Sequence, residues 1–126
     1  MPLYNLLQDD LLARDYLQMD ETTTQVLKEE NKKATSKSYM WVRYALGTRP
    51  IVLYDYAPSR SGQVPIELLE GFKGRLQDDG YAQVCEKNNL IRMGCMDHAR
   101  RKFFDAFKTS GTKDIEKRGL SFFKKL

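Results

Sequence analysis

Two neighbouring stretches of aromatic and β-branched residues constrain the fold most. They are "SYMWVRYALG" (residues 38–47) and "TRPIVLYDYA" (residues 48–57), and both have the composition typical of strands. Only the short connection Gly-Thr-Arg-Pro separates the two, which favours an antiparallel hairpin. A third strand-like stretch, residues 16–27, precedes them, so the pattern predicts a three-stranded antiparallel meander.

Apolar residues at helical spacing mark the parts of the chain outside the meander. Leu3, Leu6, Leu7 and Leu11 form one stripe and predict an opening helix. Pro65 stands in a first-turn position of a short crossover helix. In chain order, we predict a helix over 3–14, a loop over 29–37, a helix over 64–72, a strand over 74–80, a connection, a mainly apolar strand over 89–95, a helix over 96–108, a loop over 109–113 and a final helix.

A meander followed by crossover-linked parallel strands predicts an α/β fold with a mixed sheet and flanking helices. This is the element order of a ribonuclease-H-like fold. A chain of 126 residues with 41% hydrophobic and 30% charged residues fits one ordinary globular domain. We therefore expect residues 1–126 to form a single domain.

The bulk chemistry indicates a cytoplasmic protein with an anionic partner. No apolar run is long enough to cross a membrane, and the first ten residues lack the basic start of a signal peptide. Two cysteines make no disulfide framework, which favours a reducing compartment. The net charge of +4 hints at a polyanion, and the bases gather beside aromatic residues in "HARRKFF" (98–104) and "KRGLSFFKKL" (117–126).

Two aspartates far apart in the sequence are candidate metal ligands. If the first and fourth strands are neighbours, Asp20 and Asp79, each expected near a strand end, lie side by side at one edge of the sheet. Mg²⁺ prefers such oxygen ligands, and a pair of metals assists phosphodiester displacement. Acids at strand ends are also common as turn formers and helix caps, so spacing alone leaves both interpretations open.

Four strings of residues together resemble a known family. They are "MDETTTQVL" (19–27), "YMWVRY" (39–44), "VLYDYAPSRSGQVPIELLEGFKGRLQDDGYA" (52–82) and "GCMDHARRKFFDA" (94–106). They resemble the central catalytic region of bacterial DDE transposases of the insertion sequence sixty-six family, over nearly the whole chain. The resemblance implies a ribonuclease-H-like core that uses two Mg²⁺ or Mn²⁺ ions to cut transposon-end DNA and join it to target DNA.

The resemblance assigns the two aspartates their roles. Asp20 matches the first acid of the catalytic triad in "DET", and Asp79 matches the second in "DGY". Asp78 stands where the family commonly has threonine, and strand alternation sends it to the opposite face from Asp79. Glu21 likewise faces away from Asp20, as a surface acid or a support for the site.

The string Cys95-Met96-Asp97-His98 resembles a Cys-x-x-His signature that follows the fifth strand in many DDE transposases. A zinc site needs two more ligands, and the chain has no other histidine. We therefore expect Cys95 and His98 to support the site rather than to bind zinc. Asp97 departs from the small apolar residue of the family and suits a helix cap.

The third acid of the triad is expected beyond this chain. In the family it is a glutamate on a helix after an inserted region, and the strings around Asp114 and Glu116 do not resemble that region. The family's N-terminal DNA-binding segment is also not recognised. The chain thus resembles a C-terminally truncated core fragment, which we expect to be inactive by itself.

Basic side chains are the candidate DNA contacts. Arg60 lies in "PSRSG", and Arg100, Arg101 and Lys102 follow the fifth strand. Such residues neutralise backbone phosphates, although a solvated helix face has the same composition. Trp41 and Tyr81 suit either stacking on a displaced base or burial in the core.

Three functions therefore compete. The first is the transposase core, with DNA as partner, a nucleoid-associated location and a homo-oligomeric full-length enzyme. The second is a remnant that binds DNA or protein without chemistry. The third is a ribonuclease-H-type nuclease that acts alone, which requires a third carboxylate from this chain near Asp20.

Overall fold

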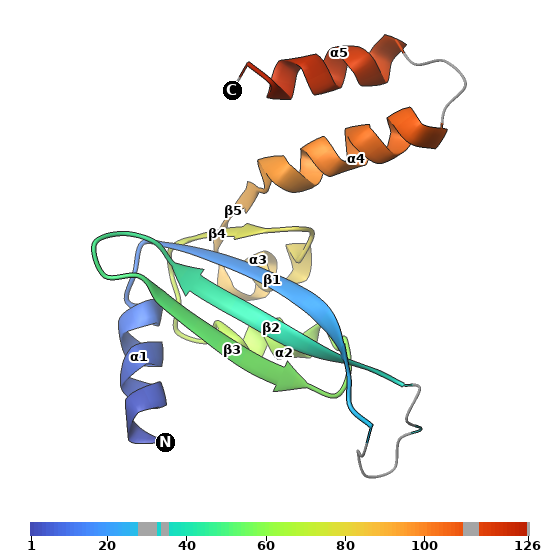
Figure 1. Cartoon of the computed structure of the whole chain (residues 1–126). Coiled ribbons are helices and arrows are strands. Elements are labelled where there is room, and N and C mark those ends of the chain that lie inside the picture. Colours follow the sequence, from blue (N-terminus) through green and yellow to red (C-terminus); the bar gives the residue numbers. More distant parts are fainter. Residues whose placement is uncertain (28–32, 34–35, 110–113, 126) are drawn as a thin grey trace. The chain divides into compact units, whose positions relative to one another are not determined.

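A computed structural model describes residues 1–27, 33, 36–109 and 114–125, and these divide into two compact units, 1–93 and 94–126 (Figure 1). Most of the predicted loop over 29–37, and residues 110–113 of the second predicted loop, lie outside the described residues. The elements in chain order are α1 (Pro2–Leu12), β1 (Tyr16–Gln25), β2 (Lys37–Ala45), β3 (Ile51–Ala57), α2 (Gln63–Leu68), β4 (Arg75–Asp78), α3 (Ala82–Asn88), β5 (Ile91–Gly94), α4 (Met96–Thr109) and α5 (Asp114–Phe123).

The strands form one five-stranded mixed sheet of order β3-β2-β1-β4-β5. β1 pairs antiparallel with β2, and β2 pairs antiparallel with β3, so the predicted meander is confirmed. On its other side β1 pairs with β4 in parallel. The α/β class and the neighbourhood of the first and fourth strands are therefore both as the sequence predicts.

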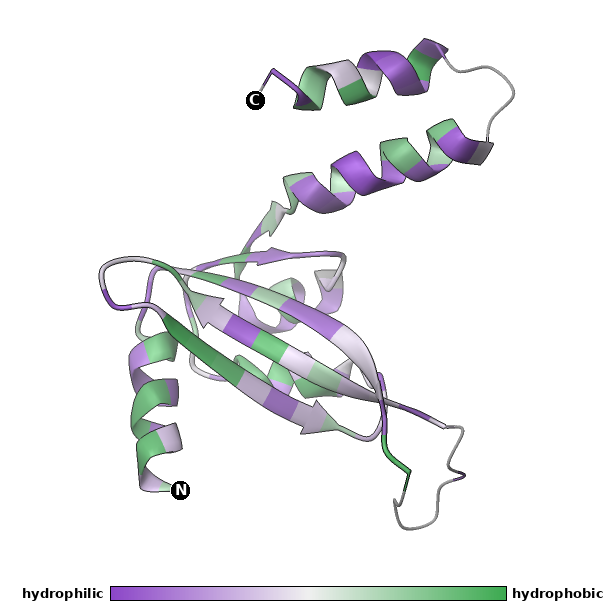
Figure 2. Cartoon of the chain, in the orientation of Figure 1, coloured by the Kyte–Doolittle hydropathy of each residue, from purple (hydrophilic) through white to green (hydrophobic). Residues whose placement is uncertain are grey.

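One face of the sheet holds the core of the first unit. Strand alternation buries Leu17 and Met19 of β1 and Leu53 of β3, and they pack in one cluster with Leu69 and Phe72. Figure 1 shows α2 and α3 on a single side of the strands. Figure 2 shows the beginning of β3 in green, as hydrophobic, and Ile51 and Leu53 of this strand belong to the core. The helices thus cover the face onto which the alternating apolar residues project.

A buried arginine joins three elements of this unit. Arg43 of β2 is fully buried, and its Nε donates to Asp55 Oδ2 of β3 at 2.9 Å. Its Nη1 donates to the Leu68 carbonyl at 2.6 Å, and its Nη2 donates to the Tyr4 hydroxyl at 2.9 Å and to Gln8 Oε1 at 3.2 Å. Tyr4 in turn donates to Asp55. Because every charge has partners, burial of the ion pair is tolerated and α1 is fastened to the sheet.

Two elements differ from the sequence-based expectation. The region predicted as a connection contains α3, whose seven residues are too few to show a helical period. The strand predicted to end at Gly80 ends at Asp78. The mainly apolar strand predicted over 89–95 is β5, but all its residues are exposed. It lies at the edge of the sheet, where an apolar run is not evidence of burial.

The second unit is a pair of packed amphipathic helices, and in Figure 2 hydrophobic and hydrophilic bands alternate along α4 and α5. Phe103 and Phe123 pack with ring centroids 5.9 Å apart. Gly119 permits this contact, because a Cβ there would lie 2.5 Å from the Phe103 ring. Both helices match the predicted ones. Among the described residues, no helix is long and apolar enough to cross a membrane.

Candidate catalytic carboxylates and basic residues

The parallel pairing of β1 with β4 ends shortly before each of the two predicted metal ligands. The parallel pairing runs from Tyr16 with Arg75 to Gln18 with Gln77. β4 ends at Asp78, so Asp79 is the first residue after it; Asp79 lies two positions beyond Gln77, and Asp20 lies two positions beyond Gln18. Asp20 was predicted near a strand end, but it lies in the middle of β1, because β1 continues to Gln25 through its pairing with β2.

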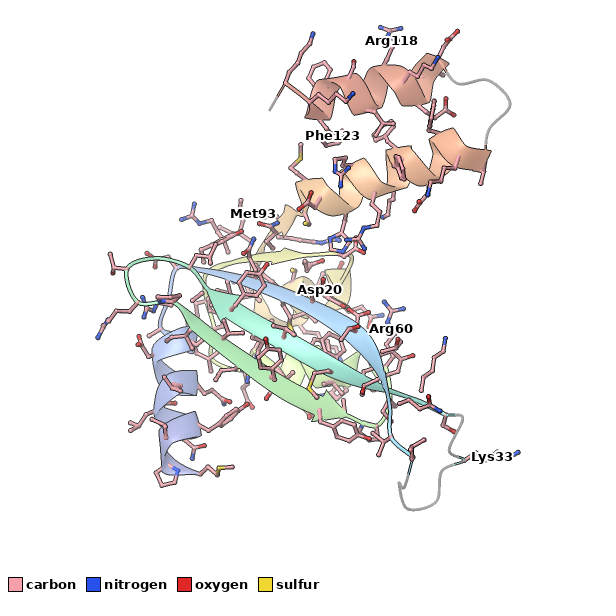
Figure 3. All side chains as sticks on the ribbon, viewed as in Figure 1. Asp20, Lys33, Arg60, Met93, Arg118 and Phe123 are labelled. Atoms are coloured by element: carbon pink, nitrogen blue, oxygen red, sulfur yellow. The ribbon has the colours of Figure 1, made fainter. Side chains whose placement is uncertain are left out.

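Both side chains lie outside the core. Asp20 and Asp79 are exposed, whereas Met19 and Asp78, which precede them, are buried. Within β1 the alternation places Asp20 on the sheet face opposite the hydrophobic core, whereas Asp79 follows the end of β4. Figure 3 shows Asp20 on β1, and one of its carboxylate oxygens accepts the Glu21 backbone N–H at 2.9 Å. This pair of carboxylates is open to solvent and to ligands.

Asp78 has a different environment from its neighbour. Its Oδ1 accepts the backbone N–H groups of Gly80 at 2.5 Å and Tyr81 at 2.8 Å, and Arg92 Nε of β5 donates to both carboxylate oxygens at 3.2 and 3.3 Å. The Cys85 thiol also approaches Asp78 Oδ2 at 3.8 Å. Burial, with Asp78 adding to it, raises the pKa of Cys85 and keeps this thiol protonated. Asp78 therefore fixes the turn in which Asp79 stands.

Glu21 and Arg60 form a contact that the sequence did not reveal. The Arg60 guanidinium of the loop between β3 and α2 makes an ion pair with the Glu21 carboxylate of β1. The Glu21 side chain is 10% exposed and that of Arg60 is 62% exposed, as Figure 3 shows for Arg60 at the margin of the unit. Burial raises the pKa of Glu21, and Arg60 opposes that shift. Glu21 thus anchors the "PSRSG" loop to the strand that contains Asp20.

Trp41 and Tyr81 were predicted either to stack on DNA or to lie in the core. Trp41 is 1% exposed, and its ring lies 5.1 Å from the half-buried ring of Tyr81, centroid to centroid. The two rings pack against each other beside the Asp79 turn. Trp41 is therefore a core residue.

The basic residues of α4 are exposed. Arg100, Arg101 and Lys102 are all on the surface of the second unit, and Arg100 has a weak ion pair with Asp97 at 3.7 Å. Asp97 lies in the first turn of α4, where a carboxylate suits the helix dipole. The predicted support residues Cys95 and His98 are half-buried in the same unit, and Cys95 is a free thiol.

The third carboxylate of a triad is not assembled in the described part of the chain. No group of three or more His, Cys, Asp or Glu side chains there is arranged to hold a metal ion. Asp114 and Glu116 lie in the first turn of α5, in the second unit. Within the described residues, the candidate site is therefore limited to the pair Asp20 and Asp79.

Comparison with known proteins defines the class. A family model described as "Transposase IS66 family" matches residues 1–126. The chain belongs to this transposase family.

Three curated relatives, all from Sinorhizobium fredii, are similar to the chain. Uncharacterized protein y4qI is 34% identical over 68% of this chain and 19% of its own length. Uncharacterized proteins y4hP and y4jD are 33% and 32% identical over 94% and 88% of this chain, and each is covered over 24% of its length. The chain thus spans about a quarter or less of these relatives. No solved structure matches.

Proposed function

We propose that this chain is part of the catalytic core of a DNA transposase, in which Asp20 and Asp79 bind divalent metal for cleavage and strand transfer of DNA. The observation that supports this most is the parallel pairing of β1 with β4, which leaves Asp20 on β1 and Asp79 directly after β4, each two residues beyond the last paired residues, Gln18 and Gln77. Membership of the IS66 transposase family supplies the substrate class, DNA. The meander extended through β1 into a parallel pair is also the arrangement expected for a ribonuclease-H-like core.

The two carboxylates suit Mg²⁺ or Mn²⁺. Both are exposed, both offer hard oxygen donors, and the remaining positions around such an ion are commonly taken by water and phosphate oxygens. When bound, two such ions activate an attacking oxygen and stabilise a leaving oxygen in phosphodiester displacement. In this chain Asp20 and Asp79 would hold metal, and Asp78 would hold the turn of Asp79 in place through its contacts with Gly80, Tyr81 and Arg92.

Titration with Mn²⁺ tests the metal site. Calorimetry on the 126-residue chain should show binding that falls at least tenfold in Asp20→Asn and in Asp79→Asn, because each variant replaces a charged ligand with a neutral amide. Asp15→Asn is the matched control, since Asp15 is an exposed acid of the same unit that precedes β1. Binding that is equal in all four proteins would refute the assignment of Asp20 and Asp79.

A second candidate function is DNA binding without chemistry, and the exposed bases of α4 favour it. A plasmid-nicking assay with Mg²⁺ or Mn²⁺ separates the two functions. Nicking that depends on Asp20 and on metal supports the catalytic core. DNA binding that persists in EDTA, together with Mn²⁺ binding that is unchanged in Asp20→Asn and Asp79→Asn, supports the binding module.

A further inference from the structure

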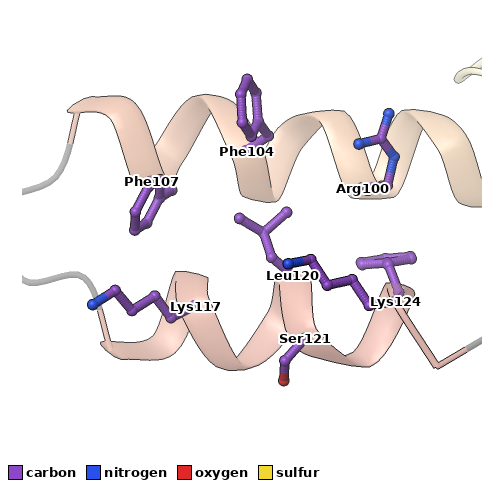
Figure 4. Close-up of a pocket in the computed structure, with 8 residues that line it drawn as sticks. Arg100, Phe104, Phe107, Lys117, Leu120, Ser121 and Lys124 are labelled. Carbon is purple, nitrogen blue, oxygen red and sulfur yellow. The ribbon is translucent and has the colours of Figure 1, made fainter.

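A pocket of about 410 Å³ lies between the two helices of the second unit. Its walls come from both helices, and Figure 4 shows Phe107 and Leu120 facing the space between them, with Lys117 near one end and Arg100 near the other. The lining combines apolar and basic side chains, chiefly Arg100, Phe104, Phe107, Lys117, Leu120 and Lys124. The size is within the range of sites that hold small molecules.

The aromatic part of the pocket is accessible. Phe104 is 40% exposed, and neither helix has a fully buried residue among those described. Phe103 and Phe123 pack against each other across the helix pair, whereas the Lys108 ammonium lies over the Phe104 ring, 4.5 Å from its centroid. Aromatic rings in this setting are stacking platforms for planar groups.

The charge around the pocket has one sign. Each of its charged lining residues is basic: Arg100, Lys117 and Lys124. The sequence around the pocket also favours a positive electrostatic potential, because residues 94–126 contain nine Lys and Arg against four Asp and Glu. An occupant that is both planar and anionic is complementary to this lining.

We propose that the α4–α5 pocket binds an unpaired base of single-stranded DNA, with the base against Phe104 and Phe107 and the flanking phosphates at Arg100, Lys117 and Lys124. This inference rests on the proposed function only in taking DNA as the partner. Bases in a duplex are stacked inside it and cannot enter a side-chain pocket without being extruded. The pocket therefore distinguishes single strands, or strand ends that have opened, from intact duplex.

Fluorescence anisotropy on the full chain in EDTA tests this site. The probes are a labelled single strand of about 12 nucleotides, within the usual footprint of such sites, and the duplex of the same sequence. We expect tighter binding of the single strand. Phe104→Ala should weaken single-strand binding by roughly fivefold or more, as expected for loss of one stacked base, and should change duplex binding less than about twofold.

Matched variants keep the result interpretable if Phe104→Ala disturbs the helix pair. Phe122→Ala removes a phenylalanine of α5 that is 73% exposed and outside this pocket, and it should leave both affinities unchanged. Phe104→Trp retains a stacking surface and should retain single-strand binding. Equal effects of Phe104→Ala and Phe122→Ala, equal affinity for both probes, or displacement by an acidic aromatic peptide but not by unlabelled single strand would each overturn the proposal.

Failure of this inference is separable from failure of the proposed function. The anisotropy assay contains no metal, so its outcome does not depend on metal binding at Asp20 and Asp79. Lost single-strand preference together with normal Mn²⁺ binding overturns the pocket alone. Single-strand binding through Phe104 together with Mn²⁺ binding that ignores Asp20 and Asp79 overturns the metal site alone.

Discussion

Asp78 and Asp79 are adjacent acids with separate roles. The Asp78 carboxylate is buried and accepts two backbone N–H groups and the Arg92 guanidinium, whereas Asp79 is exposed. We predict that Asp78→Ala lowers the free energy of unfolding by about 1 to 3 kcal/mol or more, because it leaves buried donors without an acceptor. Asp79→Ala should change it by no more than about 0.5 kcal/mol. Urea denaturation of both variants measures the difference.

The same pair of variants also separates support from metal binding. If Asp78 positions Asp79, Asp78→Ala should weaken Mn²⁺ binding in protein that is still folded, and Asp78→Thr, the residue commonly found in the family, should restore part of it through its hydroxyl. A stability loss without any change in Mn²⁺ affinity would make Asp78 purely structural. Greater instability in Asp79→Ala than in Asp78→Ala would contradict the assignment of roles.

Glu21 gives a pH dependence with a defined sign. Burial raises its pKa in the folded state above the ordinary value of 4.5, despite the ion pair with Arg60. The folded protein therefore retains the Glu21 proton to a higher pH than the unfolded chain does. The protonated carboxyl contributes to the free energy of unfolding below pH 4.5, and this contribution is lost as pH rises through the pKa of the folded state. Glu21→Gln is permanently neutral, so its stability relative to wild type should increase from about pH 4 to about pH 7.

Urea denaturation at both pH values checks this prediction. Glu70→Gln, a change at an exposed glutamate, is the control for altering a surface acid. A Glu21→Gln variant that is destabilised more at the higher pH than at the lower would show that the Arg60 ion pair outweighs the burial of Glu21.

At the scale of single residues, the sequence strings pointed to Asp20 and Asp79 as candidate ligands because the family pattern surrounds both. The ion pairs made by their sequence neighbours, Asp78 and Glu21, were not predictable in the same way. Arg92 contacts Asp78, and Arg60 contacts Glu21, only because the fold brings separate strands and loops together. Local alternation predicted that Asp78 would face away from Asp79, but it does not show which basic side chain would form an ion pair with Asp78.

Among the elements, β4 depends on a close backbone contact at its start. Gly74 precedes β4, where the Arg75 N–H donates to the Asp15 carbonyl at 2.8 Å. A Cβ on Gly74 would overlap that carbonyl and would lie 2.7 Å from the Phe72 ring. Gly74→Ala should therefore cost about 1 to 3 kcal/mol of stability. Gly74→Ala should also weaken Mn²⁺ binding, because a shift of β4 along β1 would move Asp79 relative to Asp20.

Gly94→Ala is the matched change for this test. A Cβ at Gly94 meets no atom within 4 Å, and we expect thermal unfolding and Mn²⁺ affinity close to those of the wild type. Equal midpoints for Gly74→Ala and Gly94→Ala would mean that β4 adjusts without cost. A destabilised Gly74→Ala with unchanged metal affinity would mean that the site does not depend on the β1–β4 register.

The long periodic elements were the predictable ones. The meander was predictable from strand-like residue types in neighbouring stretches, such as the nine residues of β2. α1 and α4 were predictable from the helical spacing of apolar residues over 11 and 14 residues. α3 was missed because a seven-residue helix completes only about two turns. The exposure of β5 was not predictable from the sequence, because edge position in a sheet is a property of strand order, which local composition does not encode.

At the scale of the whole molecule, charge is divided unequally along the chain. Residues 94–126 contain nine bases and four acids, which leaves twelve bases and thirteen acids for residues 1–93. DNA binding through phosphates is therefore expected to depend on the second unit. Because such binding releases counterions, the logarithm of the affinity for duplex should fall linearly with the logarithm of salt concentration.

The slope of that line measures how many phosphates the protein neutralises. Changing Arg100, Arg101 and Lys102 together to Gln should reduce the slope by about 0.9 for each duplex phosphate that is no longer neutralised, hence by up to roughly 3. The matched variant changes three exposed bases of the first unit, Lys37, Arg49 and Lys73, to Gln. Since both variants lower the net charge by the same amount, an equal reduction of slope in the two would mean that DNA binding follows total charge rather than the basic face of α4.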